Sequence, residues 1–386
     1  MHLDLLRGIS AIAVLAQHLR GICFGAPRPD VRTVAKGVYF LTGLGHAAVI
    51  FFFVLSGFFI GTSVLDSVAA RRWLWRHFLL RRLTRLWVVL IPVLVITFAL
   101  DSMGMHLFGD EGTIYSGKLV ELWSAAGARE TLSIRVFFGN LFFLQEMRTS
   151  VYGTNGALWS LGYEFWCYLL FPLFVLAFAR SSSWKTRGLA TLGVLAIFGI
   201  TNNLPLIKYF GLWLFGAIVA AVWRVAAKRW ASTGPWLGFA SVLLAGAVAF
   251  DRVARGEVWA DFALAAATAI FMIVLLARAA QGRCAPVGER YQRFATTLAG
   301  FTYTLYLVHF PIVVFFSAAC IRAERWDPTA THVAAATTLG FGILAFSYLL
   351  ARLTERHTDA VRASIEAALG RWMKGSPERR APSDGR

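Results

Sequence analysis

The sequence predicts an all-α fold, a polytopic membrane bundle of about ten transmembrane helices with one short re-entrant or interfacial helix. Three observations predict it. Of the 386 residues, 58% are hydrophobic and only 15% are charged, and the mean hydropathy is +0.61, which is typical of membrane proteins rather than soluble domains. The apolar residues fall into windows long enough to cross the hydrocarbon core. Lysine and arginine recur in the connections between those windows, as they do in cytoplasmic loops.

The predicted spans follow one another along most of the chain. They cover residues 3–25, 38–64, 86–103, 157–179, 188–203, 206–226, 235–250, 258–278, 295–320 and 330–352. The apolar run 136–144 is too short to cross the bilayer, so we interpret it as the re-entrant or interfacial helix.

Charged loops orient these spans. The connection that runs from Arg71 to Arg85 is strongly basic, and the connections at 180–187, 224–229 and 278–293 fall on the same side in a ten-span count. Cytoplasmic loops carry such an excess. The acidic residues of the third connection fall on the other side: Asp110, Glu111, Glu121 and Glu130. We therefore predict a plasma (inner) membrane protein with both termini cytoplasmic, a membrane domain at 1–355 and a short polar cytoplasmic tail at 356–386.

The sequence gives little support for a nucleic-acid site or a metal site formed by cysteines. The net charge of +17 is spread between apolar segments, whereas a nucleic-acid binder gathers its bases on one folded surface, so we expect no nucleic-acid partner. The cysteines show no metal-ligand spacing, and we interpret them as packing residues, with a disulfide between Cys23 and Cys320 as the minor alternative. These cysteines are Cys23, Cys167, Cys284 and Cys320.

The first span carries charged and titratable residues on one face. Arg7 and His18 are eleven positions apart, which at about 100° per residue places them within about 20° of each other and about 16 Å apart along the axis. Asp4 lies on the same stripe. Because charges inside a membrane span are costly, a functional role is the default interpretation. This helix is therefore expected to form one wall of a polar cavity.

Two further titratable residues are expected at the depth of His18, which lies roughly 22 Å above the inner end of its span. Glu164 lies roughly 10 Å below the outer end of the fourth span, and His309 lies again roughly 22 Å up the ninth. A shared depth indicates one cavity. Each residue also has a structural alternative: Glu164 bonds a neighbouring helix, and His309 satisfies the carbonyl that Pro311 leaves free. The arginine run is, on its own, more often a topology determinant than a ligand site.

Five motifs then occur in a fixed order along the chain. Arg7 and His18 form an Arg-x10-His helix, and residues 50–58 read Ile-Phe-Phe-Phe-Val-Leu-Ser-Gly-Phe. They are followed by Arg81-Arg82-Leu83-Thr84-Arg85, by Trp159-Ser160-Leu161 with Glu164, and by Tyr303 to Pro311. In this order the chain resembles the membrane-bound acyltransferase 3 family, O-acyltransferases that decorate bacterial surface and exported polysaccharides. Two departures concern local geometry: the proline expected soon after Arg-x-x-Arg is displaced to Pro92, and Phe165 replaces a second acidic residue.

The resemblance implies a function and the partners it needs. The donor substrate is expected to be acyl-CoA, most often acetyl-CoA, with no bound cofactor and no metal. The acceptor is a hydroxyl of a saccharide or lipid-linked glycan at or beyond the outer half of the membrane, and membrane lipids surround the protein. The reaction is expected to be acyl transfer, either direct or through an acyl-His18 intermediate.

Roles for individual residues follow from this expectation. His18 is the expected base, assisted by Arg7 and by Glu164, which orients the imidazole or holds the acceptor. Arg82 and Arg85 are expected to bind the CoA phosphates, with Arg7 also placed for them. The pantetheine arm is expected to approach Ser56 and Gly57. The remaining cavity residues are Asp4, Trp159, Ser160, Tyr303, Tyr306 and His309.

Two other functions remain open at this stage. A transporter or flippase of a lipid-linked saccharide or acyl group also needs polar residues inside the membrane, although the sequence shows no recognisable inverted repeat. A membrane scaffold would leave His18 replaceable. Transfer of label from acetyl-CoA to a glycan separates these classes from the enzyme.

Overall fold

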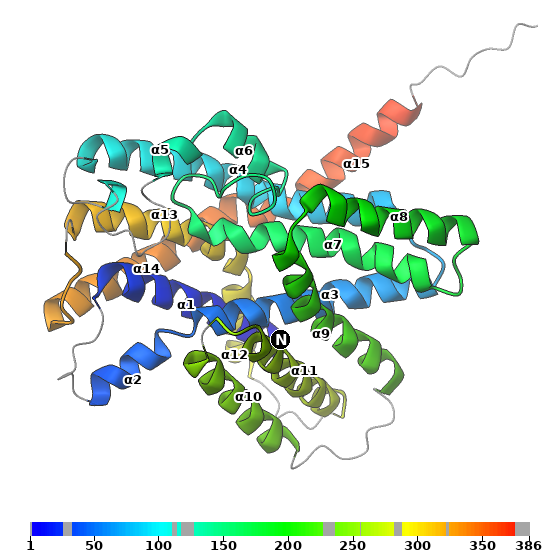
Figure 1. The fold of residues 1–386 in the computed structure, drawn as a ribbon, viewed down its shortest axis with the longest axis horizontal. Coiled ribbons are helices and arrows are strands. Elements are labelled where there is room, and N and C mark those ends of the chain that lie inside the picture. Colours follow the sequence, from blue (N-terminus) through cyan, green and yellow to red (C-terminus); the bar gives the residue numbers. More distant parts are fainter. Residues whose placement is uncertain are drawn as a thin grey trace, which may run out of the picture.

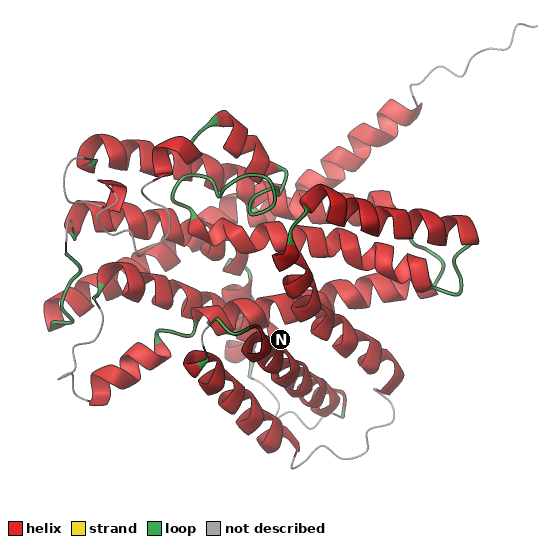
Figure 2. Ribbon diagram, viewed as in Figure 1, coloured by secondary structure: helices red, strands yellow, loops and turns green. Residues whose placement is uncertain are grey.

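The computed structural model confirms the predicted all-α fold. It describes residues 2–25, 33–109, 114–116, 127–226, 236–254, 256–281, 288–321 and 324–374. Helices account for most of this described chain (Figure 2). Extended pairing within it is limited to two isolated bridges, Phe24 with Trp326 and Gln145 with Thr149.

A long helix occupies each of the ten predicted spans. In chain order these are α1 (His2–Cys23), α3 (Gly45–Ala69), α4 (Trp75–Phe108), α7 (Trp159–Phe178), α8 (Trp184–Thr201), α9 (Leu204–Ala226), α10 (Trp236–Val253), α11 (Val258–Ala280), α13 (Thr302–Cys320) and α14 (Ala330–Leu353). Among the described residues, 8 helical segments are long and apolar enough to cross a membrane. α1 and α8 are outside that set, and both carry charged residues. The chain is a multi-pass membrane protein.

Three predicted boundaries are wrong. The predicted span 38–64 is interrupted at 42–44, between α2 (Thr33–Leu41) and α3. α4 begins at Trp75 rather than near 86, so Arg81, Arg82 and Arg85 lie on a helix instead of in a connection; arginine is a good helix former, and hydropathy alone does not register it. The predicted span 295–320 is two helices, because α12 (Glu289–Ala299) ends at Gly300 and α13 begins at Thr302.

The predicted short helix corresponds to α6 (Ile134–Leu141), whose first turn is capped by the Ser133 hydroxyl accepting from the Val136 amide. The chain then turns at Phe143, which has a φ of 59°. Residues 142–158 form a folded segment that leads through the 3-10 helix Gly156–Leu158 into α7. A position of α6 at the membrane interface stays a prediction.

α3 is the central helix of the bundle, in contact with α1, α7, α9 and α11 (Figure 1). Its closest neighbour is α9. A side chain at Gly57 would collide with the Trp213 carbonyl oxygen, and one at Gly216 would collide with the Val54 carbonyl oxygen. Gly61, one turn further along α3, lies against Ala217. Small residues at this spacing let two membrane helices approach backbone to backbone.

The outer surface of the bundle is apolar where lipid is expected. On α8, Leu189, Leu192 and Leu195 are 70%, 62% and 62% exposed and recur at near-helical spacing. Such a stripe is unfavourable in water and favourable against acyl chains. It agrees with α8 being a spanning helix despite its charged first turn.

The remaining helices are short or peripheral. They are α2 (Thr33–Leu41), α5 (Ala128–Thr131) and α15 (Thr358–Lys374), with 3-10 helices at Ile114–Ser116 and Glu355–His357. α15 occupies the first half of the predicted polar tail and projects from the bundle (Figure 1); residues 375–386 lie outside the described part. Cys23, Cys167 and Cys320 are free thiols, so the minor alternative of a disulfide is wrong. Cys284 lies outside the described residues.

Candidate active site

A cavity lies between α1, α3, α4, α7 and α13, with an empty volume of about 960 Å³ that includes its open mouth. Most of its wall is apolar and aromatic, while a small set of polar groups converges on it. The polar lining residues are Arg7, Ser56, Arg82, Arg85, Ser160, Glu164, Tyr168, Thr302, Tyr303 and Tyr306.

Arginines from two helices, Arg7 on α1 and Arg82 and Arg85 on α4, meet on the cavity wall. A guanidinium nitrogen of Arg7 (Nη2) donates to the Ala299 carbonyl oxygen at 2.8 Å. The Nε atoms of Arg7 and Arg82 are buried and have no hydrogen-bond partner in the described structure. Buried N–H groups of a charged side chain are rarely left without an acceptor. These arginines therefore provide a site for an anion.

Glu164 faces the arginines across the cavity. Its carboxylate oxygen Oε1 accepts from the Ser56 hydroxyl at 3.0 Å and from the Tyr168 hydroxyl. Ser56 in turn accepts from the Trp213 indole N–H at 3.3 Å. Glu164 is close enough to Arg7 for their charges to attract each other. A fixed carboxylate therefore borders the same space as the cations.

The structure places Glu164 on the cavity wall with the arginines and apart from the histidines, which do not line the cavity. Ser56, its partner, lies eleven residues after Gly45, about 16 Å along the axis of α3. Gly156, just before α7, packs against the Phe310 ring. Glu164 therefore belongs to the level of the arginines rather than to that of the histidines.

The histidines form a pair beyond the cavity. His18 Nδ1 and His309 Nε2 are 2.7 Å apart, and the rings are stacked with centroids 5.0 Å apart and an interplanar angle of 11°. His309 Nδ1 lies 2.9 Å from the Leu305 carbonyl oxygen. The His309 ring is also 6.1 Å from that of Tyr306, which borders the cavity and shares a 2.6 Å hydrogen bond with Ser160. The pair thus adjoins one end of the cavity without lining it.

The hydrogen bonds assign the protons of the neutral pair. A carbonyl oxygen only accepts, so His309 Nδ1 carries a proton and donates to Leu305. A neutral imidazole has one N–H, so His309 Nε2 is bare and accepts from His18 Nδ1. His18 Nε2 then holds the free lone pair. The His18 imidazole is therefore arranged as a base at Nε2.

Comparison with known proteins identifies the family. The family model described as an acyltransferase domain, acyltransferase 3, matches residues 2–352. The chain belongs to the acyltransferase 3 family. It is similar to the acyltransferase MdmB of Streptomyces mycarofaciens, with 25% identity over 373 residues that cover 88% of this chain and 87% of the relative. The O-acetyl transferase of Shigella phage Sf6 is 24% identical over 218 residues, 55% of this chain and 57% of that protein. No solved structure matches.

Several residues that the sequence assigned to the site lie elsewhere in this acyltransferase. Gly57 packs against α9 and is absent from the cavity wall, so its predicted contact with pantetheine is wrong. The Trp159 ring instead meets the Tyr163 ring edge-on and the Tyr209 ring at a tilt. Asp4 does not line the cavity, although it is close enough to Arg7 for an electrostatic interaction.

Glu164 does not orient the His18 imidazole, because its carboxylate accepts hydrogen bonds from Ser56 and Tyr168. His309 performs that role. The interpretation of His309 as the partner of the carbonyl freed by Pro311 is also wrong. That carbonyl belongs to Leu307, four residues before the proline, and it accepts from the Asn155 side-chain amide at 2.9 Å.

Two residues that the sequence analysis missed support the candidate site. Glu355 follows α14 and its Oε2 accepts from the Thr304 hydroxyl at 3.0 Å, close enough to Arg7 and Arg85 to attract both. Asp101 is fully buried in α4 and accepts from the Thr154 amide and hydroxyl, each at 2.7 Å. It holds the segment before α7 against α4. Charged residues are usual at the ends of membrane spans, so nothing in the sequence marked Glu355 as a residue of the site.

Proposed function

We propose that this acyltransferase moves an acyl group, acetyl in the first instance, from cytoplasmic acyl-CoA to a hydroxyl of a saccharide or lipid-linked glycan. The donor is polyanionic and the cavity wall holds Arg7, Arg82 and Arg85, with buried Nε groups that lack acceptors. This is the observation that carries the proposal. Phosphates are the acceptors that guanidinium groups bind best.

His18 acts as the general base in the proposed reaction. Its Nε2 takes the proton of the acceptor hydroxyl while the hydroxyl oxygen attacks the thioester carbonyl. The carbon–sulfur bond then breaks, the acyl ester remains on the acceptor, and the CoA sulfur leaves with the proton returned from His18. A neutral imidazole is suited to this exchange near neutral pH. His309 keeps the His18 proton on Nδ1 and so keeps Nε2 free.

We place the donor site toward the cytoplasm and the acceptor toward the outer half of the membrane. Arg7 lies in the first third of α1, and Arg82 and Arg85 lie in the first third of α4. The basic connections predict that these ends face the cytoplasm. His18 lies further along α1. A thioester on a long flexible arm can span that separation, which its phosphates cannot.

The experiment is transfer of radiolabel from labelled acetyl-CoA in inverted membrane vesicles that contain the protein and the glycans of its own host. Label in the glycan fraction, released by mild alkali as expected of an O-ester, is the result we expect. The Arg81→Ala variant is the control, because Arg81 is exposed and outside the cavity. Transport of an unmodified saccharide without ester formation would instead support a flippase and overturn the proposal.

A further inference from the structure

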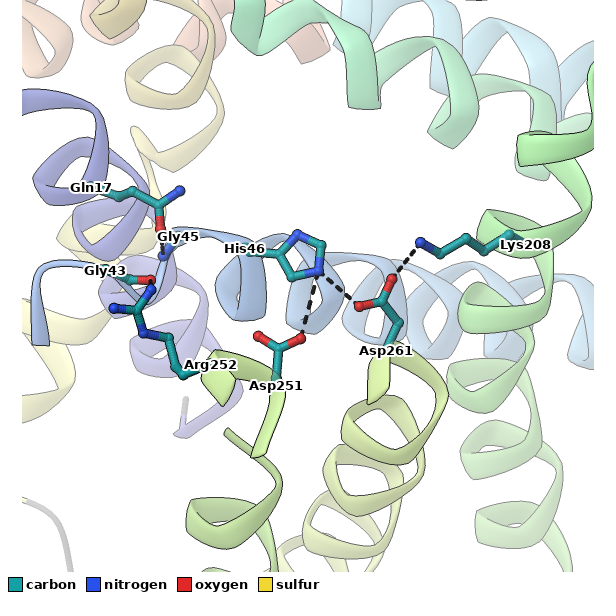
Figure 3. Close-up of polar contacts among 8 residues, drawn as sticks. All are labelled: Gln17, Gly43, Gly45, His46, Lys208, Asp251, Arg252 and Asp261. Atoms are coloured by element: carbon teal, nitrogen blue, oxygen red, sulfur yellow. Dashed lines mark hydrogen bonds and ion pairs between the residues drawn. The ribbon is translucent and has the colours of Figure 1, made fainter. Parts of the chain in front are cut away.

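A second charged cluster lies at one end of the bundle, outside the cavity, and joins four helices (Figure 3). His46 is near the start of α3 and Lys208 near the start of α9. Asp251 is near the end of α10, and Asp261 is near the start of α11. From the sequence alone, these four residues were assigned no role.

The cluster has the dimensions of a metal site. His46 Nε2 is 2.8 Å from Asp261 Oδ1 and 3.6 Å from Asp251 Oδ1. One ligand atom from each of the three residues lies within 4.8 Å of the other two. Ligand atoms around a tetrahedral Zn²⁺, each about 2.0–2.2 Å from the ion, are separated by similar distances. A small increase in the 2.8 Å distance between His46 Nε2 and Asp261 Oδ1 is enough to admit the ion.

Burial adds an independent argument. The Asp251 side chain is only 4% exposed and points into the cluster (Figure 3). Its neighbours are His46, 3.6 Å away, and the Asp261 carboxylate, which is within hydrogen-bonding reach, and its charge also interacts with Arg252. Two carboxylates that share a buried site repel each other unless a proton or a cation lies between them. The His46 side chain is 43% exposed, so an ion has a path from solvent.

Lys208 completes the arrangement without occupying the site. Its Nζ lies 2.5 Å from Asp261 Oδ2, the oxygen that faces away from His46. Asp261 Oδ1 therefore remains directed at His46. Metal-binding carboxylates are commonly held by a second partner in this way. With His46 neutral, the two carboxylates and the lysine carry one net negative charge, which attracts a cation.

We propose that His46, Asp251 and Asp261 bind a divalent transition-metal ion. One imidazole and two carboxylates suit Zn²⁺, and Mn²⁺ accepts the same donors. The ion ties the α10–α11 pair to α3. The Gly45 amide, next to His46, donates to Gln17 Oε1 at 2.8 Å, so the site also adjoins the end of α1 that carries His18. The proposal does not depend on the acyl-transfer proposal.

The test measures metal binding by the full-length protein in detergent. After chelation, the protein is dialysed against Zn²⁺ and its metal content measured, and Co²⁺ is added separately to record the visible absorption of a low-symmetry site. We expect about one ion per chain, a Co²⁺ spectrum and a higher Tm with Zn²⁺, since binding to the folded state stabilises it. His46→Gln and Asp251→Asn should lose the ion.

The matched control is His77→Gln, because His77 is an exposed histidine of α4 outside the cluster. It should retain the ion. His46 is half-exposed, so His46→Gln is expected to fold, and the Co²⁺ spectrum of the unmutated protein supplies a measurement that needs no variant. Equal metal content in the unmutated and His46→Gln proteins would overturn the proposal. So would an unmutated protein without Zn²⁺ or a Co²⁺ spectrum, which would leave a protonated His46 paired with the two carboxylates.

Discussion

His18 Nδ1 and His309 Nε2 are 2.7 Å apart, and this contact fixes which nitrogen of His18 can accept a proton. The chain of hydrogen bonds starts at the Leu305 carbonyl oxygen and passes through Nδ1 and Nε2 of His309 to His18 Nδ1. This leaves His18 Nε2 with a free lone pair. In many hydrolases a carboxylate orients the catalytic histidine, whereas here a second neutral histidine backed by a main-chain carbonyl has that position.

His18→Ala is expected to lower the rate of acyl transfer by a factor on the order of 10²–10⁴, because general-base catalysis contributes about that much. Binding of acyl-CoA should be nearly unchanged, since His18 is outside the cavity wall. Transfer of label and acyl-CoA affinity are measured on the same preparation. Near-normal transfer by a folded His18→Ala protein would contradict the assignment of the base.

His309→Ala and His309→Gln are expected to differ. His309 is 1% exposed, and its Nε2 accepts the His18 proton. A glutamine places an amide oxygen near that position and can accept it, whereas alanine leaves His18 Nδ1 without a partner. His309→Gln should therefore retain more kcat than His309→Ala, with the KM for acyl-CoA unchanged in both. Equal loss in the two variants would indicate a purely structural role.

Arg82→Ala is expected to raise the concentration of acyl-CoA needed for half-maximal rate by about 10- to 150-fold, because a hydrogen bond to a charged group is worth about 1.5–3 kcal/mol. Arg85→Ala should act in the same direction. Arg81→Ala is the control, since Arg81 is on the same helix but is exposed and outside the cavity. The measurement is the KM for acetyl-CoA in each of the three variants. If all three variants behave alike, the arginines only determine topology.

The sequence predicted the helices well and their contacts poorly. The ten windows correspond to helices because hydropathy follows from composition alone, and the Arg-x10-His spacing correctly placed Arg7 and His18 on one helix. Gly57 shows the limit: its proximity to Ser56 suggested a ligand contact, but a glycine in a helix can face either a ligand or another helix, and only the fold determines which. The place of Glu164 among the arginines was missed for a similar reason, because the irregular segment 142–158 before α7 leaves no periodic pattern in the sequence.

Reporter fusions are expected to confirm the orientation that the basic connections predict. A fusion after Asp110 should lie outside the cytoplasm, and one within 181–187 should lie inside, since Arg180 lies in the connection after α7 and Lys185 and Arg187 lie in the first turn of α8. Alkaline phosphatase and a fluorescent protein report the two sides with opposite signals. Finding both sites on one side would require another α6 topology or a different number of crossings.

Asn155 is expected to stabilise the bend at Pro311 that positions His309. Its side-chain amide donates to the Leu307 carbonyl oxygen at 2.9 Å and to the Thr97 hydroxyl at 3.2 Å, and the residue is fully buried. Asn155→Ala leaves the Leu307 carbonyl unsatisfied, at a cost of about 1–3 kcal/mol. Thermal unfolding in detergent should show a lower Tm, with a lower kcat as His309 shifts.

A second substitution separates this specific bond from general loss of packing. Pro311→Ala restores a backbone N–H that can donate to Leu307, as in an uninterrupted helix. In the Asn155→Ala background, Pro311→Ala should therefore recover part of the lost Tm, whereas in the unmutated protein it should give no such gain because Asn155 already occupies that carbonyl. The double-mutant cycle measures this coupling directly. Strictly additive effects would show that Asn155 acts through packing alone, and that the kink at Pro311 does not depend on it.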